Sequence, residues 1–291
     1  MPFDVVVVAD KARVSLAAAL NILISRKTCP DANFTVAIPE DNSHCEEWES
    51  SAVAEEVIRL FASNIISIPT PQLLVEEKLY RIENKINALR FFGNKPVIGA
   101  DADLIFIRPL PAEFLFRPVP AAVPEHGLHV YPWAELYSIL GLRFPEIKVL
   151  CAGGEVGVPW LNAGFVVCPD GSHFGHLWHR ICRLLLHCSW VPERWPFLDQ
   201  IALPLAMAEA SPHKTVTFDN VLPARFNQNV FYWAENQGQG YIDHGYVAHH
   251  HYRVGLIEKY LSPLITWTGD EYPIIEKVLE ELRRFDDRPK D

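Results

Sequence analysis

The chain has 291 residues, 49% of them apolar, so it can bury a full hydrophobic core as one large α/β domain or as two small ones. Its formal net charge is −10, and only 26 residues are Lys or Arg. This balance disfavours a nucleic-acid partner, because binding to a phosphate backbone calls for a basic stripe. An anionic ligand would therefore need a local site, such as a bound metal ion.

Two features predict a cytoplasmic protein with no transmembrane segment. The longest apolar run, residues 14–24, contains Ser15 and Asn21 and is shorter than the roughly 20 residues that cross a bilayer. The N-terminus carries Asp4 and no basic segment before the four valines at 5–8, which predicts a buried first strand rather than a secretory signal. The sequence leaves the oligomeric state and a peripheral contact with a membrane open.

The first third of the chain predicts strands and helices in alternation. The predicted strands are residues 3–9, 33–38 and 65–68, and the predicted helices are residues 14–25, 46–62 and 79–92. Alternation of this kind predicts a mostly parallel sheet with helices on both faces.

The rest of the chain is less regular. Residues 97–107 form two apolar half-strands interrupted by two aspartates, and the Pro-rich, aromatic stretch 108–159 predicts long loops or an insertion. Further elements are predicted at 160–168 (strand), 174–188 (helix), from Phe197 (helix), 246–252 (strand) and 273–284 (helix). Because no repeat or low-complexity linker appears, we expect a single domain over residues 1–291.

Asp101 and Asp103 are the first candidates for chemistry. They would share a face or a turn at the carboxyl end of a buried strand, where ligands of open α/β sheets bind. Two carboxylates there repel each other, and a hard divalent ion such as Mg²⁺ or Mn²⁺ relieves the repulsion by taking oxygen ligands. The alternative is structural: one aspartate caps a turn and the other pairs with Arg108.

Four motifs follow one another over about residues 3–255. They are Asn84-Lys85-Ile86-Asn87-Ala88-Leu89 with the strand to Asp103 and Arg108-Pro109-Leu110, then Leu161-Asn162-Ala163-Gly164-Phe165-Val166-Val167, then Leu198-Asp199-Gln200-Ile201-Ala202-Leu203, then Arg225-Phe226-Asn227. In this order they resemble the GT-A glycosyltransferases, in particular the retaining branch with glycogenin and bacterial lipopolysaccharide galactosyltransferases. The resemblance implies a nucleotide-binding half at about 1–110 and an acceptor and donor-sugar half at about 111–270, followed by a C-terminal helix at 273–284.

The resemblance also implies a reaction and its ligands. We expect a sugar to move from a nucleotide diphosphate sugar, a UDP-sugar by resemblance, to a hydroxyl acceptor such as a glycan. The residues implied in donor binding are Ala9, Asp10, Lys85, Asp101, Ala102, Asp103, Asn162, Ala163 and Gly164. Asp10 as a turn or helix-capping residue and Lys85 as a solvated helix lysine are the structural alternatives.

A third metal ligand is implied among His249, His250 and His251. If these residues form a strand, His249 and His251 point to one side and His250 to the other. The H-x-x-G-x-x-K-P-W tail of the branch is absent, which leaves the choice of histidine open and disfavours Lys259 as a phosphate contact. A transition-metal site or a surface cluster in an unrelated fold is the alternative.

For catalysis, the resemblance implies retention, with Gln200 or Asp199 steadying positive charge on the sugar. An inverting enzyme would instead need a carboxylate base, for which Asp199 and Glu155 are candidates. Three rival functions remain: a sugar-phosphate nucleotidylyltransferase, whose Gly-rich loop is missing at residues 9–13, a catalytically silent nucleotide- or sugar-binding protein, and a His-centred metallohydrolase.

Overall fold

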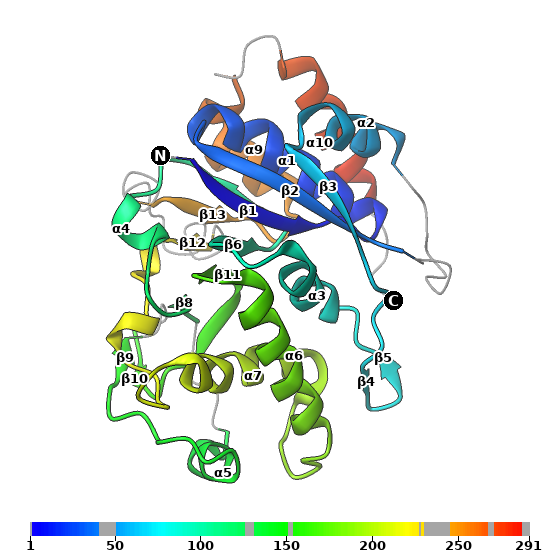
Figure 1. Cartoon of the computed structure of the whole chain (residues 1–291). Helices are drawn as coiled ribbons and strands as arrows, with labels where there is room; N and C mark the ends of the chain where they lie inside the picture. The colour runs from blue at the N-terminus through cyan, green and yellow to red at the C-terminus, as the bar shows by residue number, and fades with distance from the viewer. Residues whose placement is uncertain are drawn as a thin grey trace. The chain divides into compact units, whose positions relative to one another are not determined.

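A computed structural model describes residues 2–40, 51–125, 131–150, 154–226, 228–229, 245–266 and 271–286. The chain divides into two units. Unit 1 contains Met1–Ser67, Ala100–Pro111 and Arg225–Asp291, and unit 2 contains Ile68–Gly99 and Ala112–Ala224 (Figure 1). The expectation of one domain stays a prediction.

Unit 1 is built on the strands β1 (Phe3–Val8), β2 (Ala32–Pro39) and β3 (Asn64–Ile68), in the order β3-β2-β1. β1 and β2 run parallel, with each residue from Phe3 to Val8 opposite its partner from Ala32 to Ala37. After Asp4, β1 continues as four consecutive valines, because a parallel strand that is covered on both faces needs apolar side chains in its interior.

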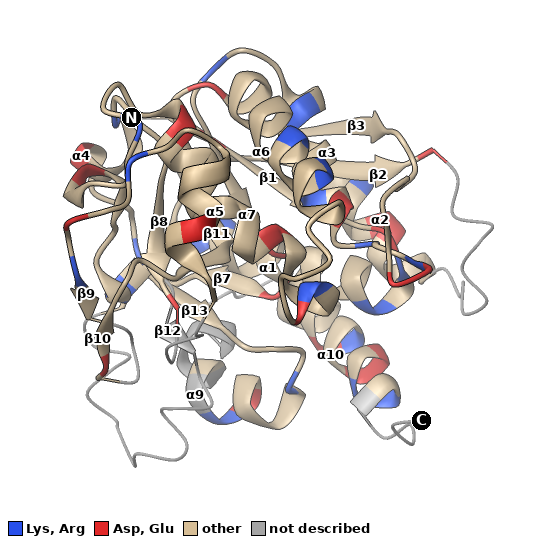
Figure 2. Cartoon of the chain, turned by 90° about the horizontal axis from the view of Figure 1, so that it is seen from below, with Lys and Arg blue, Asp and Glu red and all other residues tan. Residues whose placement is uncertain are grey.

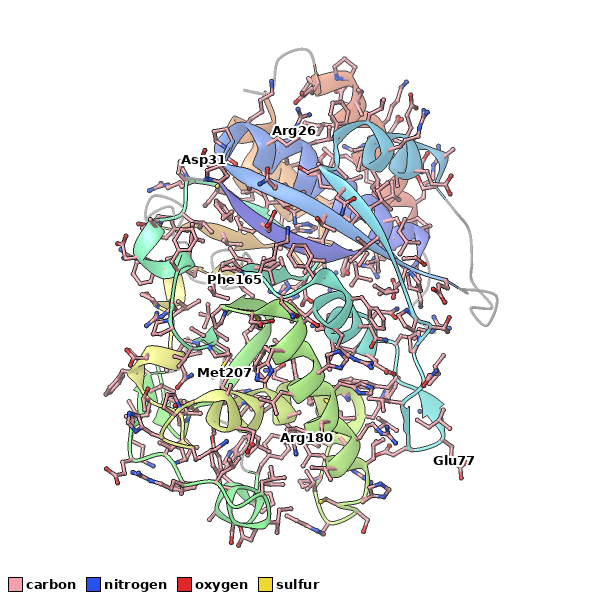
Figure 3. All side chains as sticks on the ribbon, in the orientation of Figure 1. Arg26, Asp31, Glu77, Phe165, Arg180 and Met207 are labelled. Carbon is pink, nitrogen blue, oxygen red and sulfur yellow. The ribbon has the colours of Figure 1, made fainter. Side chains whose placement is uncertain are left out.

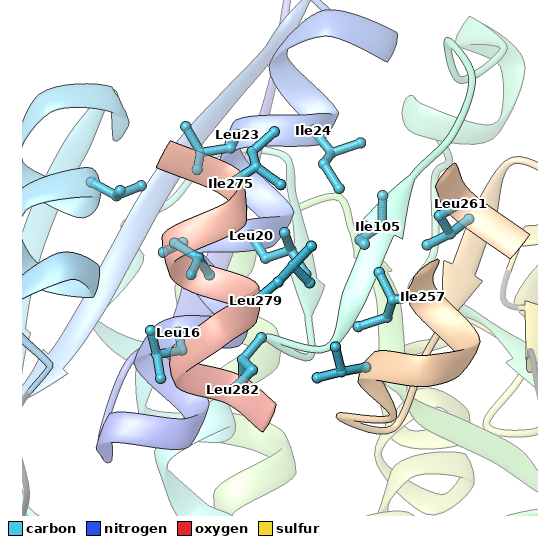
Figure 4. Packing of buried hydrophobic residues seen from close by; sticks show 14 of the residues in the cluster. Leu16, Leu20, Leu23, Ile24, Ile105, Ile257, Leu261, Ile275, Leu279 and Leu282 are labelled. Carbon is cyan, nitrogen blue, oxygen red and sulfur yellow. The ribbon is translucent and has the colours of Figure 1, made fainter. Parts of the chain in front are cut away.

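Four helices of unit 1 share a hydrophobic core, and one of them, α1, contacts β1 and β2 (Figure 1). They are α1 (Ala12–Thr28), α2 (Ala52–Phe61), α9 (Val254–Thr266) and α10 (Tyr272–Asp286). Figure 4 shows leucines and isoleucines of α1, α9 and α10 in one cluster with Ile105. α10 is amphipathic, with its apolar residues three and four positions apart, and Figure 2 shows acidic and basic residues interspersed along its other positions.

A second, three-stranded sheet in unit 1 has the order β12-β13-β7. Its strands are β12 (Gln228–Asn229), β13 (Val247–His249) and β7 (Leu104–Phe106). β13 runs antiparallel to β7 and sets His249 opposite Leu104. On its other side β7 is held by α1, because the Phe106 N–H donates to Ser25 Oγ at 2.9 Å and the Thr28 hydroxyl donates to the Phe106 carbonyl.

Unit 2 contains the strands β6 (Val97–Ala100), β11 (Leu161–Cys168) and β8 (Ala121–Pro124) in the order β6-β11-β8. The helices α3 (Glu83–Phe92), α6 (Gly171–Leu186) and α7 (Arg194–Ala210) pack together, and α7 contacts β11. Figure 3 labels Phe165 on β11 and Met207 on α7, both fully buried. α6 lies so close to α3 that a Cβ atom on Gly175 would come within 2.5 Å of the Arg90 backbone nitrogen.

The smaller elements of unit 2 connect these layers. They are β4 (Leu74–Val75), β5 (Lys78–Leu79), α4 (Ala112–Leu115), α5 (Trp133–Ile139), β9 (Val149–Leu150), β10 (Val156–Gly157) and the 3₁₀ turns at Phe218–Asn220 and Ala224–Phe226. None of the helices in the described ranges has the length and apolar composition that a bilayer span requires.

The expectation of an α/β fold with a mostly parallel sheet is confirmed, but the structure differs from the expected elements in three places. The stretch 108–159 is not only loops, because β8 pairs with β11 as an antiparallel strand. The strand expected at 246–252 ends at His249, since His251 and Tyr252 adopt positive φ angles of 47° and 60°. The helix α9 was not expected at all.

A candidate metal centre and candidate sugar-binding residues

Asp103, His249 and His251 form a cluster in unit 1. Their possible ligand atoms all lie within 4.8 Å of one another, and no other such group occurs among the residues that the structure describes. His249 Nε2 lies 3.2 Å and His251 Nδ1 lies 4.0 Å from the same oxygen, Asp103 Oδ2. The two imidazole rings stack with their centroids 3.8 Å apart.

The local backbone explains how two histidines reach one aspartate. Asp103 lies in the turn between β6 and β7, and its carbonyl accepts from the His250 N–H at 3.0 Å. β13 ends at His249, and the positive φ of His251 turns the chain, so that the ring of His251 stacks on that of His249. A positive φ is strained for a non-glycine residue, and strain of this kind concentrates at functional sites.

His250 lies apart from this cluster. It is completely buried, and its Nδ1 accepts from the Tyr252 N–H at 3.1 Å. Burial lowers the pKa of His250 to about 4, an effect that Asp103 opposes. His250 is therefore neutral at physiological pH and contributes to the fold of the turn.

Asp103 stays ionised although only 4% of its surface is exposed. Burial alone would raise its pKa, but the charge and hydrogen bond of His249, with further help from His250 and His251, hold the pKa of Asp103 below its usual range. One carboxylate oxygen and two imidazole nitrogens form a donor set that suits divalent transition-metal ions. The residues present therefore fit a metal ion.

Asp101 is half-buried and does not belong to the three-residue cluster. Burial first, and then the charges of Asp103, Asp101 and Asp10, raise the pKa of the Tyr252 phenol. Ala102, between the two aspartates of the motif, is buried.

Ala9 and Asp10 follow β1 directly. The Ala9 N–H donates to the Ala37 carbonyl at 3.0 Å, so this N–H takes part in the pairing of the β1 and β2 segments. The N-cap position of α1 is Lys11, which makes no side-chain cap, so the structural alternative of Asp10 as the helix cap is wrong. The part of Asp10 in donor binding stays a prediction.

In unit 2, Asn162 and Gln200 meet at one carboxylate. Glu125 Oε2 accepts from Asn162 Nδ2 at 2.5 Å and from Gln200 Nε2 at 2.9 Å. Asn162 Oδ1 in turn accepts from the Gly164 N–H at 2.7 Å, across the buried Ala163. The structure thus brings together Asn162 of β11 and Gln200 of α7. The residue that links them, Glu125, was not among the expected site residues.

The signal for Glu125 was present in the sequence. It is a carboxylate directly after an apolar strand, as Asp101 is, but the strand β8 was hidden in a stretch that predicted loops. The Glu125 N–H donates to the Trp160 carbonyl at 2.9 Å, which extends the pairing of β8 with β11 to this residue.

Asp199 is buried and engaged at both carboxylate oxygens. The Tyr80 hydroxyl lies 2.5 Å from Oδ1, and Lys85 Nζ lies 3.5 Å from Oδ2. Burial and the neighbouring Asp199 raise the pKa of Tyr80, which keeps the phenol protonated as a donor. These contacts suit a residue that holds the first part of α7 in place. Lys85 belongs to the same group of contacts as Tyr80 and Asp199.

The other candidates lie apart from both groups or outside the described residues. Glu155 is exposed beside β10, and Lys259 is exposed on α9. The guanidinium of Arg225 lies over the ring of Tyr246 at 5.1 Å, whereas Asn227 lies outside the described residues.

Comparisons with known proteins agree with this architecture. The sequence matches the Rhodobacterales glycosyltransferase domain over residues 5–211, which covers both aspartates of the D-x-D motif and Gln200 but ends before the histidine triplet. A search of curated proteins finds no match.

Two solved structures share the fold. The apo form of the bifunctional glycosyltransferase WbbM superposes with a TM-score of 0.54 at 13% identity, over 95% of this chain and 51% of that one. Apo GlyE of Streptococcus pneumoniae TIGR4 gives a TM-score of 0.51 at 13% identity, over 98% of this chain and 64% of that one. The chain thus spans about half of WbbM and less than two thirds of GlyE. LgtC, in complex with donor and acceptor sugar analogues, gives 0.45 at 15% identity, over 85% and 87%.

The family match covers well over half of the chain, and the expected resemblance to glycosyltransferases is confirmed. This match does not support the rival functions of a nucleotidylyltransferase and of a metallohydrolase. The chain belongs to the family of the Rhodobacterales glycosyltransferase domain.

Proposed function

We propose that this glycosyltransferase uses a nucleotide diphosphate sugar, a UDP-sugar by resemblance, and a divalent metal ion held by Asp103, His249 and His251. The cluster of these three side chains within 4.8 Å carries the proposal. The proposal includes Asp101 as a further oxygen ligand. Its position in the D-x-D motif, Asp101-Ala102-Asp103, is the reason for including it.

The donor set favours Mn²⁺ over Mg²⁺. Mg²⁺ prefers oxygen ligands in octahedral geometry, whereas imidazole nitrogens suit the transition metals and carboxylates suit Mn²⁺ as well. When bound, the ion supplies positive charge that stabilises the departing nucleotide diphosphate. Asp103 would hold it with an ionised carboxylate, and the stacking of His249 on His251 keeps two nitrogens on the same side of that carboxylate.

We assign the sugar to the residues of unit 2. The amide nitrogen of Gln200 is bound to Glu125, so the carbonyl oxygen on the other branch of the amide is the atom that would steady positive charge on the anomeric carbon. Asp199 is the weaker candidate, because Tyr80 and Lys85 engage its carboxylate. Transfer would then proceed with retention, to a hydroxyl acceptor such as a glycan.

Calorimetry tests the donor site. UDP is titrated into the wild-type protein and Asp103→Ala, each with and without Mn²⁺, and Asp31→Ala, an exposed aspartate of the same unit, serves as the matched control. We expect metal-dependent binding in the wild type and the control that is lost in Asp103→Ala. Equal binding in all samples contradicts the metal site, and binding without any sugar transfer or donor hydrolysis leaves a catalytically silent binder.

The stereochemistry has its own test. Proton nuclear magnetic resonance of the product, recorded early in the reaction, gives the anomeric configuration before it equilibrates. Retention is the expected result. Inversion contradicts the role of Gln200 and requires a carboxylate base in its place.

We also propose that the protein works in the cytoplasm. Four cysteines in the described ranges, Cys29, Cys168, Cys182 and Cys188, are free thiols, which fits a reducing compartment. Fractionation of cells that express the protein checks this, and recovery outside the cytoplasm contradicts it.

A further inference from the structure

Arg13 lies next to the metal centre in unit 1, although no motif singles it out. It belongs to the first turn of α1, three residues after Asp10. Its guanidinium carbon lies 4.6 Å from the centroid of the Tyr252 ring, and Tyr252 directly follows the candidate ligand His251. The fold of unit 1 thus joins the start of its first helix to the turn that carries the histidines.

The metal centre next to Arg13 is acidic. Tyr252, whose ring the Arg13 guanidinium covers, directly follows His251, and His251 Nδ1 lies 4.0 Å from Asp103 Oδ2. Asp101 lies two positions before Asp103 in the chain, and Asp10 lies three positions before Arg13.

A phosphate ligand needs this positive charge. A nucleotide diphosphate is a polyanion, and it would meet three carboxylates at this place. A divalent ion offsets two of those negative charges, so a further cation is required before the site attracts a phosphate rather than repels it. Lys259, which the absent tail already disfavours as a phosphate contact, is exposed on α9.

The stacked geometry suits phosphate binding. A cation–π contact uses the face of the guanidinium, whereas its N–H groups point outward in the plane and match the oxygens of a phosphate in pairs. Stacking on Tyr252 also fixes that plane in advance, which reduces the entropy lost on binding.

We propose that Arg13 binds a phosphate of the donor's diphosphate beside the metal ion, with the Tyr252 ring as the surface that orients its guanidinium. This inference rests on the proposed function. It adds a residue to the donor site that lies far from the D-x-D motif in sequence.

Arg26 offers a matched control. It lies in the last turn of the same helix and is labelled in Figure 3, and its guanidinium carbon lies 4.8 Å from the centroid of the Phe61 ring. Loss of a charge and of a cation–π contact from α1 is therefore common to Arg13→Met and Arg26→Met, and Arg26→Met also removes an ion pair with Glu271 at 3.7 Å.

The experiment measures the binding of UDP and of uridine by calorimetry, in the presence of Mn²⁺. For Arg13→Met we expect UDP to bind about 10- to 100-fold more weakly, the range for loss of a hydrogen bond to a charged group, and uridine to bind as it does to the wild type. Arg13→Lys keeps the charge without the paired donors, so its affinity for UDP should lie between those of the wild type and Arg13→Met. Arg26→Met should bind both ligands within about two-fold of the wild type.

Four outcomes overturn the inference. If Arg13→Met binds UDP with wild-type affinity, Arg13 is not part of the site, although metal-dependent donor binding remains. If the affinities for UDP and uridine fall equally, Arg13 contacts the nucleoside or the substitution damages the fold. If Arg13→Met does not fold, as thermal unfolding reveals, an unchanged UDP affinity of Arg13→Lys decides against Arg13. Failure of the wild type to bind uridine, guanosine and adenosine diphosphates with Mn²⁺ removes the proposed function together with this inference.

Discussion

At the scale of single residues, the three consecutive histidines differ in what they contact. His249 and His251 approach Asp103 Oδ2, whereas His250 is bound to the Tyr252 backbone. We expect His249→Ala and His251→Ala to weaken Mn²⁺ binding by roughly 100-fold or more, since even residues that only support a ligand contribute 10- to 100-fold. Electron paramagnetic resonance of free Mn²⁺ gives the affinity.

His250→Ala is the control for both variants. It should bind Mn²⁺ close to the wild-type affinity and lower the free energy of unfolding by about 1–3 kcal/mol, because it empties a buried, hydrogen-bonded position. Loss of Mn²⁺ from His250→Ala alone would contradict the assignment of ligands.

Glu125 and Gln200 form a pair that kinetics can test. Gln200→Ala should reduce kcat by about 100-fold or more, as expected for a group that stabilises charge in the transition state. Glu125→Gln should reduce kcat less, because it disturbs the orientation of the amide rather than removing it. The double variant should then lose little more than Gln200→Ala, since both changes act on the same contact. Multiplicative losses would show that the two residues act independently.

Glu83 links the charge of one residue to the stability of unit 2. It is buried, accepts from the backbone N–H groups of Gln72 and Leu73 at 2.7 Å each, and lies 2.9 Å from His179 Nε2. Burial alone would raise its pKa, but these hydrogen bonds, that of His179 first, lower the pKa overall. A folded-state pKa below the unfolded value stabilises the protein above the unfolded pKa, and this stability is lost as pH falls through the folded value.

We therefore expect Glu83→Gln to lower the free energy of unfolding by about 1–3 kcal/mol at pH 7, and by progressively less below about pH 4.3. Urea unfolding at pH 7 and at acidic pH measures the difference in the free energy of unfolding between the variant and the wild type. Glu56→Gln, an exposed change on α2, is the control, and its difference from the wild type should be near zero at both pH values. A difference that grows as pH falls would contradict the direction of the pKa shift.

At the scale of elements, α3 and α6 depend on a glycine for their close approach. A Cβ on Gly175 would lie 2.5 Å from the Arg90 nitrogen, whereas a Cβ on Gly255 of α9 would meet nothing within 4 Å. Gly175→Ala should therefore lower the free energy of unfolding by about 1–3 kcal/mol. Gly255→Ala should leave it unchanged or raise it by up to about 1 kcal/mol. Thermal unfolding compares the two, and equal effects would contradict the packing of α6 on α3.

The elements also show what the sequence could predict. The valine run of β1, the interruption of 97–107 by the D-x-D motif and the apolar spacing of α10 are local patterns, and each element was placed within a few residues. β8 has the sequence Ala-Ala-Val-Pro, without alternation or β-branched runs, so only its pairing with β11 makes it a strand. α9 carries Gly255 and Pro263 in its sequence, and both signals argue against a helix.

The candidate site was predictable where a motif marks it. The closeness of Asp103 to His249, 146 positions away, follows from the pairing of β7 with β13, which no local pattern reveals. Glu125 was missed with its strand. Arg13 was missed because a single arginine on a helix has no spacing to recognise.

At the scale of the whole molecule, binding of the metal ion should appear in thermal unfolding. A ligand that binds only the native state at 100 times its dissociation constant adds about 2.7 kcal/mol to stability, which for a chain of this size raises Tm by several degrees. Asp103, His249 and His251 all belong to unit 1, so the stabilisation acts there first. If the chain is a single cooperative domain, as its sequence predicts, calorimetry will show one transition that Mn²⁺ shifts as a whole. If the units unfold separately, Mn²⁺ will raise one transition, and Gly175→Ala in unit 2 will lower the other. Asp103→Ala is the control in both cases, because its transitions should not respond to Mn²⁺; a response equal to that of the wild type would place the ion elsewhere.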